Sequence, residues 1–407
     1  MPSFDFFAID ARLEGDKVVG QAKGAWAEIL QPFLDQFLSK LNSLKIIAKR
    51  QGGNVYNLYN PPHPTPAGMR FLSRRLKMTL AKQAFPVTAN LAITHRCQCQ
   101  CIHCSADPFR NPNREEVTVE EIKSVVDGAL RLGASLIIYV GGEPMLRKEL
   151  YDLIRHVDKS KAVVMIFTNG LLLTKENVKR LADAGLFSLN ISIDSVKADL
   201  HDRFRKVPGC YEKAFDGAAR AREAGILTGI STYATANCLR EGHLEQLLTK
   251  AVKDGFHEVT IFDCIPSGKF LKDTSKMLSA EEKKKVIEIG RKFHEDRSHS
   301  MGVNIMALIN SAEGEGCYGA SSQFYMTAYG DINPCDFNPV SFGNIREMPI
   351  EVIWQKMVSH PDFCYRHPQC RMQTPAYRKK YIDPLPDNPQ LPVAIEDIEA
   401  MSAARAK

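Results

Sequence analysis

No apolar run in this 407-residue sequence approaches the roughly 18 residues that span a bilayer, and no charged-then-apolar leader opens it. We therefore expect a cytoplasmic protein, in which clustered cysteines are metal ligands rather than disulfides. Eleven cysteines and 44% apolar residues allow the chain both to hold metal and to form a large core. At this length we expect one large domain with smaller attachments.

Acidic residues are absent from Gln36 to Ala106, a stretch with ten lysines and arginines in a chain whose net charge is only +6. This asymmetry indicates an anionic partner such as a phosphorylated substrate, an acidic protein or a lipid surface, unless it is only solvated surface charge. Within the stretch, NPPHPTPAG at 60–68 is a linker or an ordered turn. Residues 69–83 then predict a basic amphipathic helix, which either makes the protein peripheral to a membrane or docks on the barrel described next. We expect no nucleic-acid partner.

From Asn90 onward the sequence repeats a unit that consists of a short apolar run, a turn and a segment with helical periodicity. Apolar strands that alternate with helices predict a parallel sheet covered by helices, which curls toward a barrel. The predicted fold class is therefore α/β, a partial TIM-like barrel of six units. In its first helix Thr118 precedes Glu121 with the spacing of a capping box. The six runs are LAIT at 91–94, SLIIYV at 135–140, VVMIFT at 163–168, SLNISI at 188–193, GISTYA at 229–234 and EVTIFD at 258–263.

The barrel rhythm is confined to the middle of the chain, which divides the sequence into four regions. Residues 1–86 predict a basic helical extension, with a hairpin around EGDK and an amphipathic helix that is broken near Pro32. Residues 87–300 form the barrel, and residues 301–380 form a small cysteine-rich domain. Residues 381–407 are a Pro-rich and then helical tail.

Conspicuous residues follow the first four predicted strands. The cluster CQCQCIHC at 97–104 follows the first strand, GGEP at 141–144 the second, TNG at 168–170 the third, and Asp194 the fourth. In α/β folds of this kind, functional groups lie at the carboxyl ends of the strands. The four strand ends therefore predict one shared site. Asn169 of TNG either contacts a cofactor there or caps the next helix.

The loop at 97–104 is a strong metal-binding signal because it has four cysteines in eight residues. Cys97, Cys101 and Cys104 form the pattern C-x3-C-x2-C, and Cys99 is a rival or a fourth ligand. Three thiolates from one loop can bind three irons of a cubane cluster and leave the fourth iron without a protein ligand. Structural zinc is the alternative, but a zinc ribbon needs two C-x2-C pairs and this loop has only one.

The pattern from Cys97 to Cys104 after the first strand, with GGEP after the second, resembles the radical S-adenosylmethionine (SAM) superfamily. The resemblance implies that Cys97, Cys101 and Cys104 bind a 4Fe–4S cluster, whose free iron is chelated by the amino and carboxylate groups of SAM. It also implies that an electron from the cluster, supplied by a flavodoxin- or ferredoxin-type donor, cleaves SAM to a 5′-deoxyadenosyl radical. In this alignment Cys99 is the spare cysteine.

For GGEP the resemblance implies contact with the methionyl end of SAM. Gly141 and Gly142 lack Cβ atoms, so the backbone can approach a ligand, and main-chain groups around Glu143 would receive the methionyl amine. Pro144 would fix the turn, and an ordinary strand-to-helix turn is the alternative interpretation. His103 stands where the family usually has an aromatic residue near the adenine.

The segment SIDSVKADLHDRFRKVPGCYEKA, which begins at Ser192, resembles the same family. The match implies that Ser192 and Asp194 lie near the ribose, and that Arg205 neutralises the methionine carboxylate. Arg203 is a rival for that task. The alternative role for Arg205 is that of an exposed cation at a helix end. Lys206 replaces the glycine that often follows the arginine in relatives.

A second set of cysteines begins at Cys317, which with Gly330 and Cys335 gives C-x12-G-x4-C and precedes Cys364 and Cys370. This set resembles the SPASM or twitch extension, in which the glycine lies in a hairpin turn between two cluster ligands. The resemblance implies one auxiliary 4Fe–4S cluster with four cysteine ligands, whereas three would leave an iron open to substrate. Zinc or unconnected core cysteines are the alternatives. The cysteines without ligand spacing are expected in the core: Cys210, Cys238 and Cys264.

Together these resemblances imply an enzyme that abstracts hydrogen from a substrate carbon in a redox tailoring step. Three substrate classes stay open: an anionic small molecule such as a carboxylated tetrapyrrole, a lipid-associated molecule, and a peptide. Residues 1–86 lack the three strands of the winged helix in peptide-modifying relatives. A peptide substrate is therefore less favoured, although a separate protein could bind the peptide. A non-catalytic iron–sulfur electron carrier or scaffold is the other functional class, although it would need no adenosyl pocket.

Overall fold

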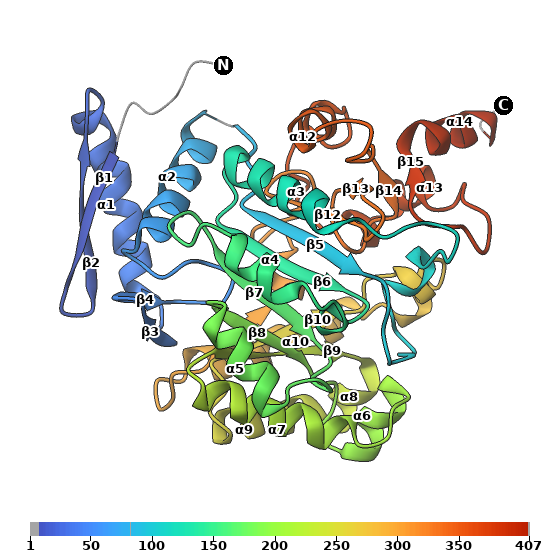
Figure 1. The fold of residues 1–407 in the computed structure, drawn as a ribbon, viewed down its shortest axis with the longest axis horizontal. Helices are drawn as coiled ribbons and strands as arrows, with labels where there is room; N and C mark the ends of the chain where they lie inside the picture. The colour runs from blue at the N-terminus through green and yellow to red at the C-terminus, as the bar shows by residue number, and fades with distance from the viewer. Residues whose placement is uncertain (1–7, 82, 406–407) are drawn as a thin grey trace.

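Seven parallel strands form the centre of the molecule in a computed structural model that describes residues 8–81 and 83–405 (Figure 1). They lie side by side in sequence order from β5 to β11, and each neighbouring pair is parallel. The six predicted strands are β5 to β10, so the predicted α/β fold with a barrel-like parallel sheet is confirmed, and β11 extends it. The strands are β5 (Thr88–Thr94), β6 (Leu136–Gly141), β7 (Val163–Thr168), β8 (Ser188–Ser192), β9 (Leu227–Ala234), β10 (Glu258–Asp263) and β11 (Gly302–Ile305).

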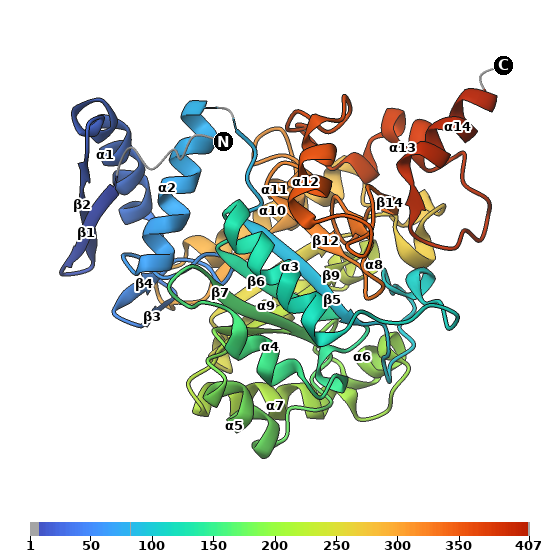
Figure 2. The same cartoon turned by 45° about the horizontal axis from the view of Figure 1, so that its top comes forward.

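Helices alternate with these strands and pack on them in one large hydrophobic core (Figures 1 and 2). The predicted capping box at the start of α3 is confirmed, because Thr118 Oγ1 accepts from the Glu121 amide and the Glu121 carboxylate accepts from the Thr118 amide. The helices of this region are α3 (Val119–Leu132), α4 (Leu150–His156), α5 (Lys175–Asp183), α6 (Ala198–Arg205), α7 (Cys210–Glu223), α8 (Ala236–Arg240), α9 (His243–Lys253), α10 (Ala280–Glu295) and α11 (Met306–Ile309).

The N-terminal region forms a small unit beside the barrel (Figure 1). β1 and β2 form the predicted hairpin around EGDK, although its first predicted residues, 4–7, lie outside the described part of the chain. The predicted break at Pro32 is wrong, because α1 runs through it with Leu30 and Leu34 buried on either side. Tertiary packing here outweighs the lost amide hydrogen bond of proline. The elements are β1 (Ala8–Glu14), β2 (Lys17–Lys23), α1 (Ala27–Ser43), β3 (Ala48–Arg50), β4 (Gly53–Val55) and α2 (Pro66–Ala81).

The basic helix α2 docks on the rest of the chain. Its Leu72 and Leu76 are buried in the same apolar cluster as the inner face of α1. On another face, Arg75 Nη2 lies 3.1 Å from Glu315 Oε2 of the C-terminal region. The apolar side chains of an interfacial helix must be free to enter lipid. In α2 these two leucines are used for packing instead.

The segment before α2 is an ordered turn rather than a linker. His63 is buried, and its amide donates to the Asn54 carbonyl at 2.9 Å. Lys82, at the end of the predicted basic helix, lies outside the described residues. Within residues 8–81 and 83–405, every helix is too short or too polar to cross a membrane.

The C-terminal region is joined to the barrel through the sheet itself. β12 pairs in parallel with β5 and antiparallel with β13, which extends the central sheet beyond its first strand. Helices α12 to α14 then pack beside this edge (Figure 2). The elements are β12 (Gln323–Met326), β13 (Ile332–Asn333), β14 (Val340–Ser341), α12 (Ile350–Ser359), α13 (Pro375–Tyr381), β15 (Val393–Ala394) and α14 (Ile395–Arg405).

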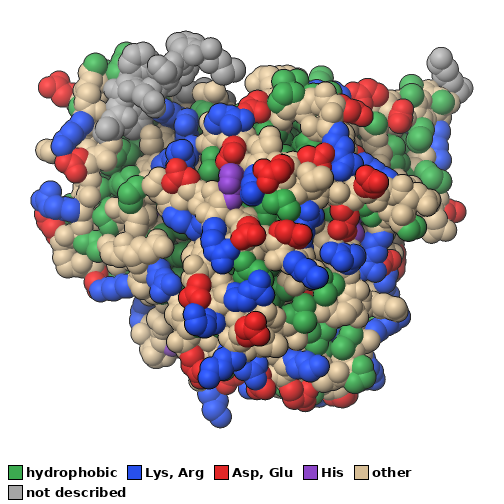
Figure 3. Space-filling model, viewed as in Figure 1, with side chains coloured by type: hydrophobic (Ala, Val, Ile, Leu, Met, Phe, Trp, Pro, Cys, Tyr) green, Lys and Arg blue, Asp and Glu red, His purple; other side chains and the backbone are tan. Residues whose placement is uncertain are grey.

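Charges of both signs are interspersed on the face drawn in Figure 3. Basic residues of the acid-free stretch are partly matched by acids from elsewhere, as Lys49 is by Asp16 at 2.6 Å. The stretch therefore does not translate directly into one basic patch on this face.

Candidate active site

A cavity of about 580 Å³ opens at the carboxyl ends of the parallel strands. It is lined by all four cysteines of the loop 97–104, by Gly141 and Gly142 at the end of β6, and by Ser192 and Asp194 at the end of β8. Three cysteines of the second set line the same cavity. The predicted convergence of the strand ends therefore exists, and it includes the C-terminal region.

The cysteine loop is held by backbone contacts from segments far away in sequence. The amides of Gln100 and Ile102 donate to the carbonyls of Arg205 and Phe204 at the end of α6, at 3.2 and 3.1 Å. Lys269 donates its amide to the Cys104 carbonyl at 3.2 Å and its Nζ to the Cys101 carbonyl at 3.0 Å. No local pattern in the sequence marks Lys269 for this task.

A glycine next to this lysine permits the contact. A Cβ atom on Gly268 would lie 2.4 Å from the Cys104 carbonyl oxygen and 2.3 Å from the Ser105 Cα. The backbone there has a φ of +55°, in the left-handed region that favours glycine. The loop after β10 can therefore lie directly on the cysteine loop.

The thiols of Cys97 and Cys101 are poised for metal binding. Hydrogen bonding to Cys99 lowers the pKa of Cys97 to about 7, and the same kind of contact, aided by the Arg205 guanidinium, lowers the pKa of Cys101 to about 5. Burial has the opposite effect at the third position, where it raises the pKa of Cys104. Since metals bind the thiolate form, two of the three predicted ligands are already biased toward it.

The donor set fits a four-iron cluster better than a single ion. Among the described residues, no three His, Cys, Asp or Glu side chains gather closely enough to hold one metal ion. A cubane does not require such convergence, because each of its thiolates binds a different iron. Soft thiolates from one cavity wall are ligands of this kind. Cys97, Cys101 and Cys104 are the residues that the sequence pattern predicts would hold it.

Gly141 and Gly142 are required by the protein's own packing. A Cβ atom on Gly141, whose φ is +140°, would lie 2.0 Å from the Thr94 carbonyl oxygen. One on Gly142 would lie 2.3 Å from the Arg96 carbonyl oxygen. The two glycines therefore let this backbone pack against the segment that leads into the cysteine loop, a contact additional to the predicted contact with a ligand.

Around GGEP, two of the backbone amides already donate within the protein. The Gly142 amide donates to the Thr94 carbonyl at 2.7 Å, and the Glu143 amide donates to the Arg96 carbonyl at 2.8 Å. An amine donates hydrogen bonds, so carbonyl groups there would suit the methionyl amine. Pro144 is buried and begins a short 3-10 turn, as a residue that fixes the turn should.

The Glu143 side chain points inward and ties strand ends together. Its carboxylate accepts from Thr168 Oγ1 at 2.9 Å, from the Asn169 amide at 2.8 Å and from the Met145 amide at 3.1 Å. Burial raises its pKa to about 7 despite these three donors. Asn169 both lines the cavity, with Nδ2 3.2 Å from Gln98 Oε1, and closes its own turn.

Asp194 and Arg205 form a buried pair on the cavity wall. Arg205 Nε and Nη2 lie 2.8 and 3.0 Å from the two Asp194 oxygens, and Arg205 Nη1 lies 3.7 Å from Cys101 Sγ. Burial opposes the Asp194 charge, but Arg205 keeps the pKa of Asp194 below its usual range. His103 Nε2 lies 3.7 Å from Asp194, beside the Tyr233 ring. Arg205 therefore presents one free edge to the cysteine loop and not to open solvent.

Arg203, the rival arginine, does not line the cavity, and Lys206 adopts the backbone conformation that favours the glycine it replaces. Arg203 is exposed and pairs with Asp199 at 3.2 Å. Lys206 has a φ of +55° and a ψ of +38°, which is the left-handed conformation that a glycine would adopt there at lower cost. The backbone geometry that the departure put in question is therefore present.

The second cysteine set is brought together only in part. Gly330, with a φ of +90°, lies in the turn between β12 and β13, as predicted. Cys317, Cys335 and Cys370 line the cavity. Cys364 is exposed and does not line it. The four cysteines are thus not equivalent in the structure.

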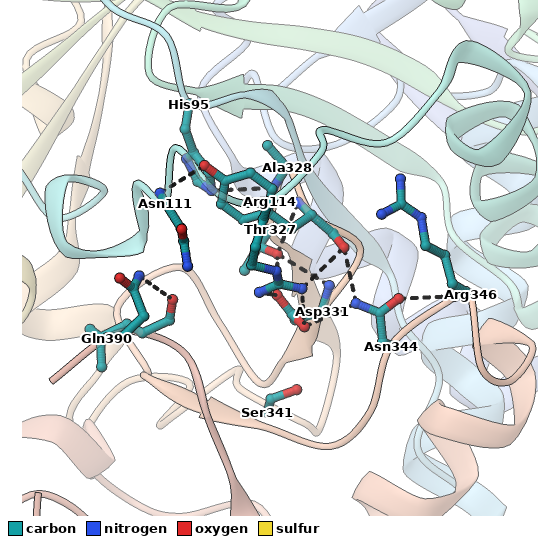
Figure 4. Close-up of polar contacts among 12 residues, drawn as sticks. His95, Asn111, Arg114, Thr327, Ala328, Asp331, Ser341, Asn344, Arg346 and Gln390 are labelled. Carbon is teal, nitrogen blue, oxygen red and sulfur yellow. Dashed lines mark hydrogen bonds and ion pairs between the residues drawn. The ribbon is translucent and has the colours of Figure 1, made fainter.

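The loop after the cysteines binds the C-terminal hairpin through one carboxylate (Figure 4). Arg114 Nη1 and Nη2 lie 2.8 and 3.0 Å from the two oxygens of Asp331. Thr327 Oγ1 and Asn344 Nδ2 donate to the same carboxylate at 2.8 and 3.0 Å. His95, two residues before Cys97, accepts from the Ala328 amide at 3.2 Å. The two cysteine regions are therefore mechanically connected.

Two family models match this chain. Residues 91–237 match the model described as the radical SAM superfamily, and residues 317–373 match the SPASM model, described as an iron–sulfur cluster-binding domain. The first region contains the barrel strands β5 to β9 with the cysteine loop, and the second contains the whole C-terminal cysteine set. The radical SAM domain implies a 4Fe–4S cluster and SAM as cofactors, and the SPASM domain implies auxiliary iron–sulfur binding.

Two relatives match the chain in sequence, and a solved structure shares its fold. The AdoMet-dependent heme synthase of Oleidesulfovibrio alaskensis is 28% identical over 65% of this chain and 73% of its own length. The PqqA peptide cyclase of Bradyrhizobium diazoefficiens is 34% identical over 35% of this chain and 37% of its own length. Streptococcus suis SuiB bound to its precursor peptide SuiA shares the fold, with a TM-score of 0.57, 15% identity and coverage of 86% of this chain and 88% of that chain. The chain carries a radical SAM domain over residues 91–237 of its barrel, followed by a SPASM iron–sulfur cluster-binding domain over residues 317–373.

Proposed function

We propose that this protein is a radical SAM tailoring enzyme that abstracts a hydrogen atom from a substrate carbon. When bound, the cluster and SAM supply a 5′-deoxyadenosyl radical for that step. The observation that carries the proposal is the cavity, which both cysteine sets share with the residues around GGEP and the end of β8. An electron carrier would need no enclosed space beside its cluster.

The chain's own residues would perform four tasks. Cys97, Cys101 and Cys104 would hold the first cluster, and carbonyls around Gly142 would accept hydrogen bonds from the methionyl amine. Ser192 and Asp194 would lie near the ribose, and His103 near the adenine. Arg205 would reach the carboxylate of SAM only through Nη1, because Nε and Nη2 bind Asp194.

The cavity supports an uncharged and largely apolar reacting group. Its three arginines are each paired, Arg75 with Glu315 at 3.1 Å, Arg110 with Asp107 at 3.4 Å, and Arg205 with Asp194. Many aromatic rings line it instead: Tyr59, Phe71, Phe167, Tyr233, Phe262, Tyr318, Tyr325 and Phe337. These rings favour a substrate part without free carboxylates, which ranks a carboxylated tetrapyrrole below a peptide side chain or a lipid-like molecule.

A peptide substrate has one further observation in its favour. Among the described residues, β1 and β2 pair with no other strand. The outer edge of β2 is covered by α1, because the Val18 amide donates to Asn42 Oδ1 and the Ala22 amide donates to Gln31 Oε1, both at 2.8 Å. The outer edge of β1 is therefore the edge that could accept an extended chain. Beside the hairpin, Trp26, which precedes α1, and Ile29 and Phe33 of α1 are 51, 60 and 44% exposed. A flavodoxin- or ferredoxin-type protein remains our proposal for the electron donor.

The test is SAM cleavage by the reconstituted protein. The chain is loaded anaerobically with iron and sulfide, reduced with dithionite and incubated with SAM, and 5′-deoxyadenosine is measured by chromatography. We expect product from the wild type and none from the Cys97, Cys101 and Cys104 triple alanine variant. Absence of product from the wild type, with equal iron in both proteins, would favour the non-catalytic electron carrier or scaffold.

A further inference from the structure

Three of the four cysteines in the second set are fixed on the cavity wall. The Cys317 amide donates to the His367 carbonyl at 2.8 Å, and the Cys370 amide donates to the Asn310 carbonyl at 3.1 Å. These two bonds cross-link the segments that carry Cys317 and Cys370. Both thiols lie close enough to Cys335 to interact with it electrostatically.

The fourth cysteine faces away. Cys364 is exposed, its amide donates to the His360 carbonyl at 2.8 Å, and its thiol donates to the Pro361 carbonyl at 3.3 Å. Both contacts belong to the turn that follows α12. They hold Cys364 on the surface and not at the cavity.

Arg371 locks this arrangement. Its side chain is fully buried, and Nη2 donates to the carbonyls of Asp362 and Tyr365 at 2.9 Å each, on either side of Cys364. Its Nη1 lies 3.4 Å from the Gly319 carbonyl, beside Cys317. Moving Cys364 to the cavity would break the two bonds of Nη2 and leave that buried nitrogen without acceptors.

We propose that Cys317, Cys335 and Cys370 alone hold the auxiliary cluster, and that its fourth iron is open to the cavity for a nitrogen, oxygen or sulfur donor of the substrate. This proposal rests on the proposed function only for the identity of the group at this site. A four-iron cluster held by three thiolates would leave its fourth iron without a protein ligand, and these three thiols line the cavity that would hold the substrate. Asp336, which also lines the cavity, is the protein group best placed to compete for that position.

Iron content separates the cysteines. We expect about eight irons per wild-type chain, about eight in Cys364→Ala, and about four in the matched variant Cys370→Ala. In the Cys97, Cys101 and Cys104 triple alanine background, Cys364→Ala should retain about four irons and Cys370→Ala almost none. Loss of about four irons from Cys364→Ala in either background overturns the three-cysteine site.

The open position is tested by electron paramagnetic resonance of the reduced triple alanine variant, which retains only the auxiliary cluster. Imidazole should shift the g values of the signal, because it supplies a nitrogen donor to the fourth iron. Asp336→Asn should leave the signal before imidazole addition unchanged. An unchanged signal with imidazole, or an altered one in Asp336→Asn alone, contradicts an open iron.

These readouts do not depend on SAM cleavage. If 5′-deoxyadenosine formation fails while the iron counts follow the expected pattern, the proposed function is wrong and the three-cysteine site stands. If Cys364→Ala forms 5′-deoxyadenosine at the wild-type rate but has lost about four irons, the reverse is true.

Discussion

Cys99 is the cysteine of the loop at 97–104 that we propose is not a metal ligand. It is buried, with 2% exposure, and its thiol is within hydrogen-bonding reach of Cys97, Cys101 and Cys210. The contact with Cys210 ties Cys99 to the start of α7, and Cys99 also lines the cavity with the other three cysteines of the loop. In the predicted register, where Cys97, Cys101 and Cys104 are the ligands, Cys99 and Cys210 have a packing role.

At this scale we predict that Cys99→Ala keeps the first cluster, whereas Cys101→Ala loses it. The alanine removes a buried thiol without changing the loop backbone, so any loss of stability should be about 1 kcal/mol. The measurement is iron content and the visible absorbance of the reconstituted protein. Loss of about four irons from Cys99→Ala would mean that Cys99 is a ligand.

At the scale of elements, the amino end of the barrel is closed by a segment of the N-terminal region. The Leu58 amide donates to Glu258 Oε2 at the start of β10 at 3.0 Å. Tyr59 reaches further in, where its hydroxyl lies 3.1 Å from Thr260 Oγ1 and accepts from Asn190 Nδ2 at 3.1 Å. Residues before the barrel therefore form part of the cavity wall.

Glu258 should make stability depend on pH. Burial raises its pKa to about 8, whereas in the unfolded chain it ionises near its ordinary value of about 4.3. Between these values the unfolded state binds fewer protons, so the free energy of unfolding falls as the pH rises, by at most about 1.4 kcal/mol per pH unit. Below about pH 4 this contribution is constant.

The measurement is denaturant unfolding of the wild type and Glu258→Gln between pH 5 and about pH 8. Glutamine keeps an acceptor for the Leu58 amide but cannot ionise, so its stability should fall less steeply with pH. Equal slopes for the two proteins would show that Glu258 ionises normally in the folded state.

At the scale of the whole molecule, the C-terminal region is docked by both backbone and charge. β12 continues the sheet beside β5, and Asp331 collects donors from the loop after the cysteines and from the C-terminal hairpin (Figure 4). The Arg114 guanidinium also lies 4.9 Å from the Tyr329 ring centre. The second cysteine set is thereby held in register with the first.

We predict that Asp331→Ala weakens this docking by about 2 kcal/mol, because it leaves a partly buried arginine and a buried hydroxyl without their acceptor. Hydrogen exchange should rise in residues 327–345 while the barrel strands β6 to β8 stay protected. Lys179→Ala is the control: it removes an exposed ion pair with Asp183 within α5, away from the C-terminal region, and should cost less than about 1 kcal/mol. Equal exchange in Asp331→Ala and wild type would assign the docking to the sheet alone.

Local signals carried most of the barrel and the first cysteine site. The six apolar runs became strands because each buries both faces, and the cysteines, GGEP and Ser192 with Asp194 each follow a strand, so one edge of the sheet gathers them. The prediction of a break at Pro32 was wrong because it considered the low helix propensity of one proline and not the packing of several buried leucines. Local rules cannot measure that balance.

The sequence by itself determined the metal chemistry and the barrel, because ligand spacing within one loop and apolar periodicity within one strand are fixed by neighbours along the chain. Only the tertiary structure decided that Cys364 is turned outward, that Lys269 holds the cysteine loop, and that Tyr59 enters the cavity wall. Each of these depends on contacts between segments many residues apart, such as Arg371 with the carbonyls around Cys364. Long-range packing of this kind has no periodicity or spacing that a single sequence displays.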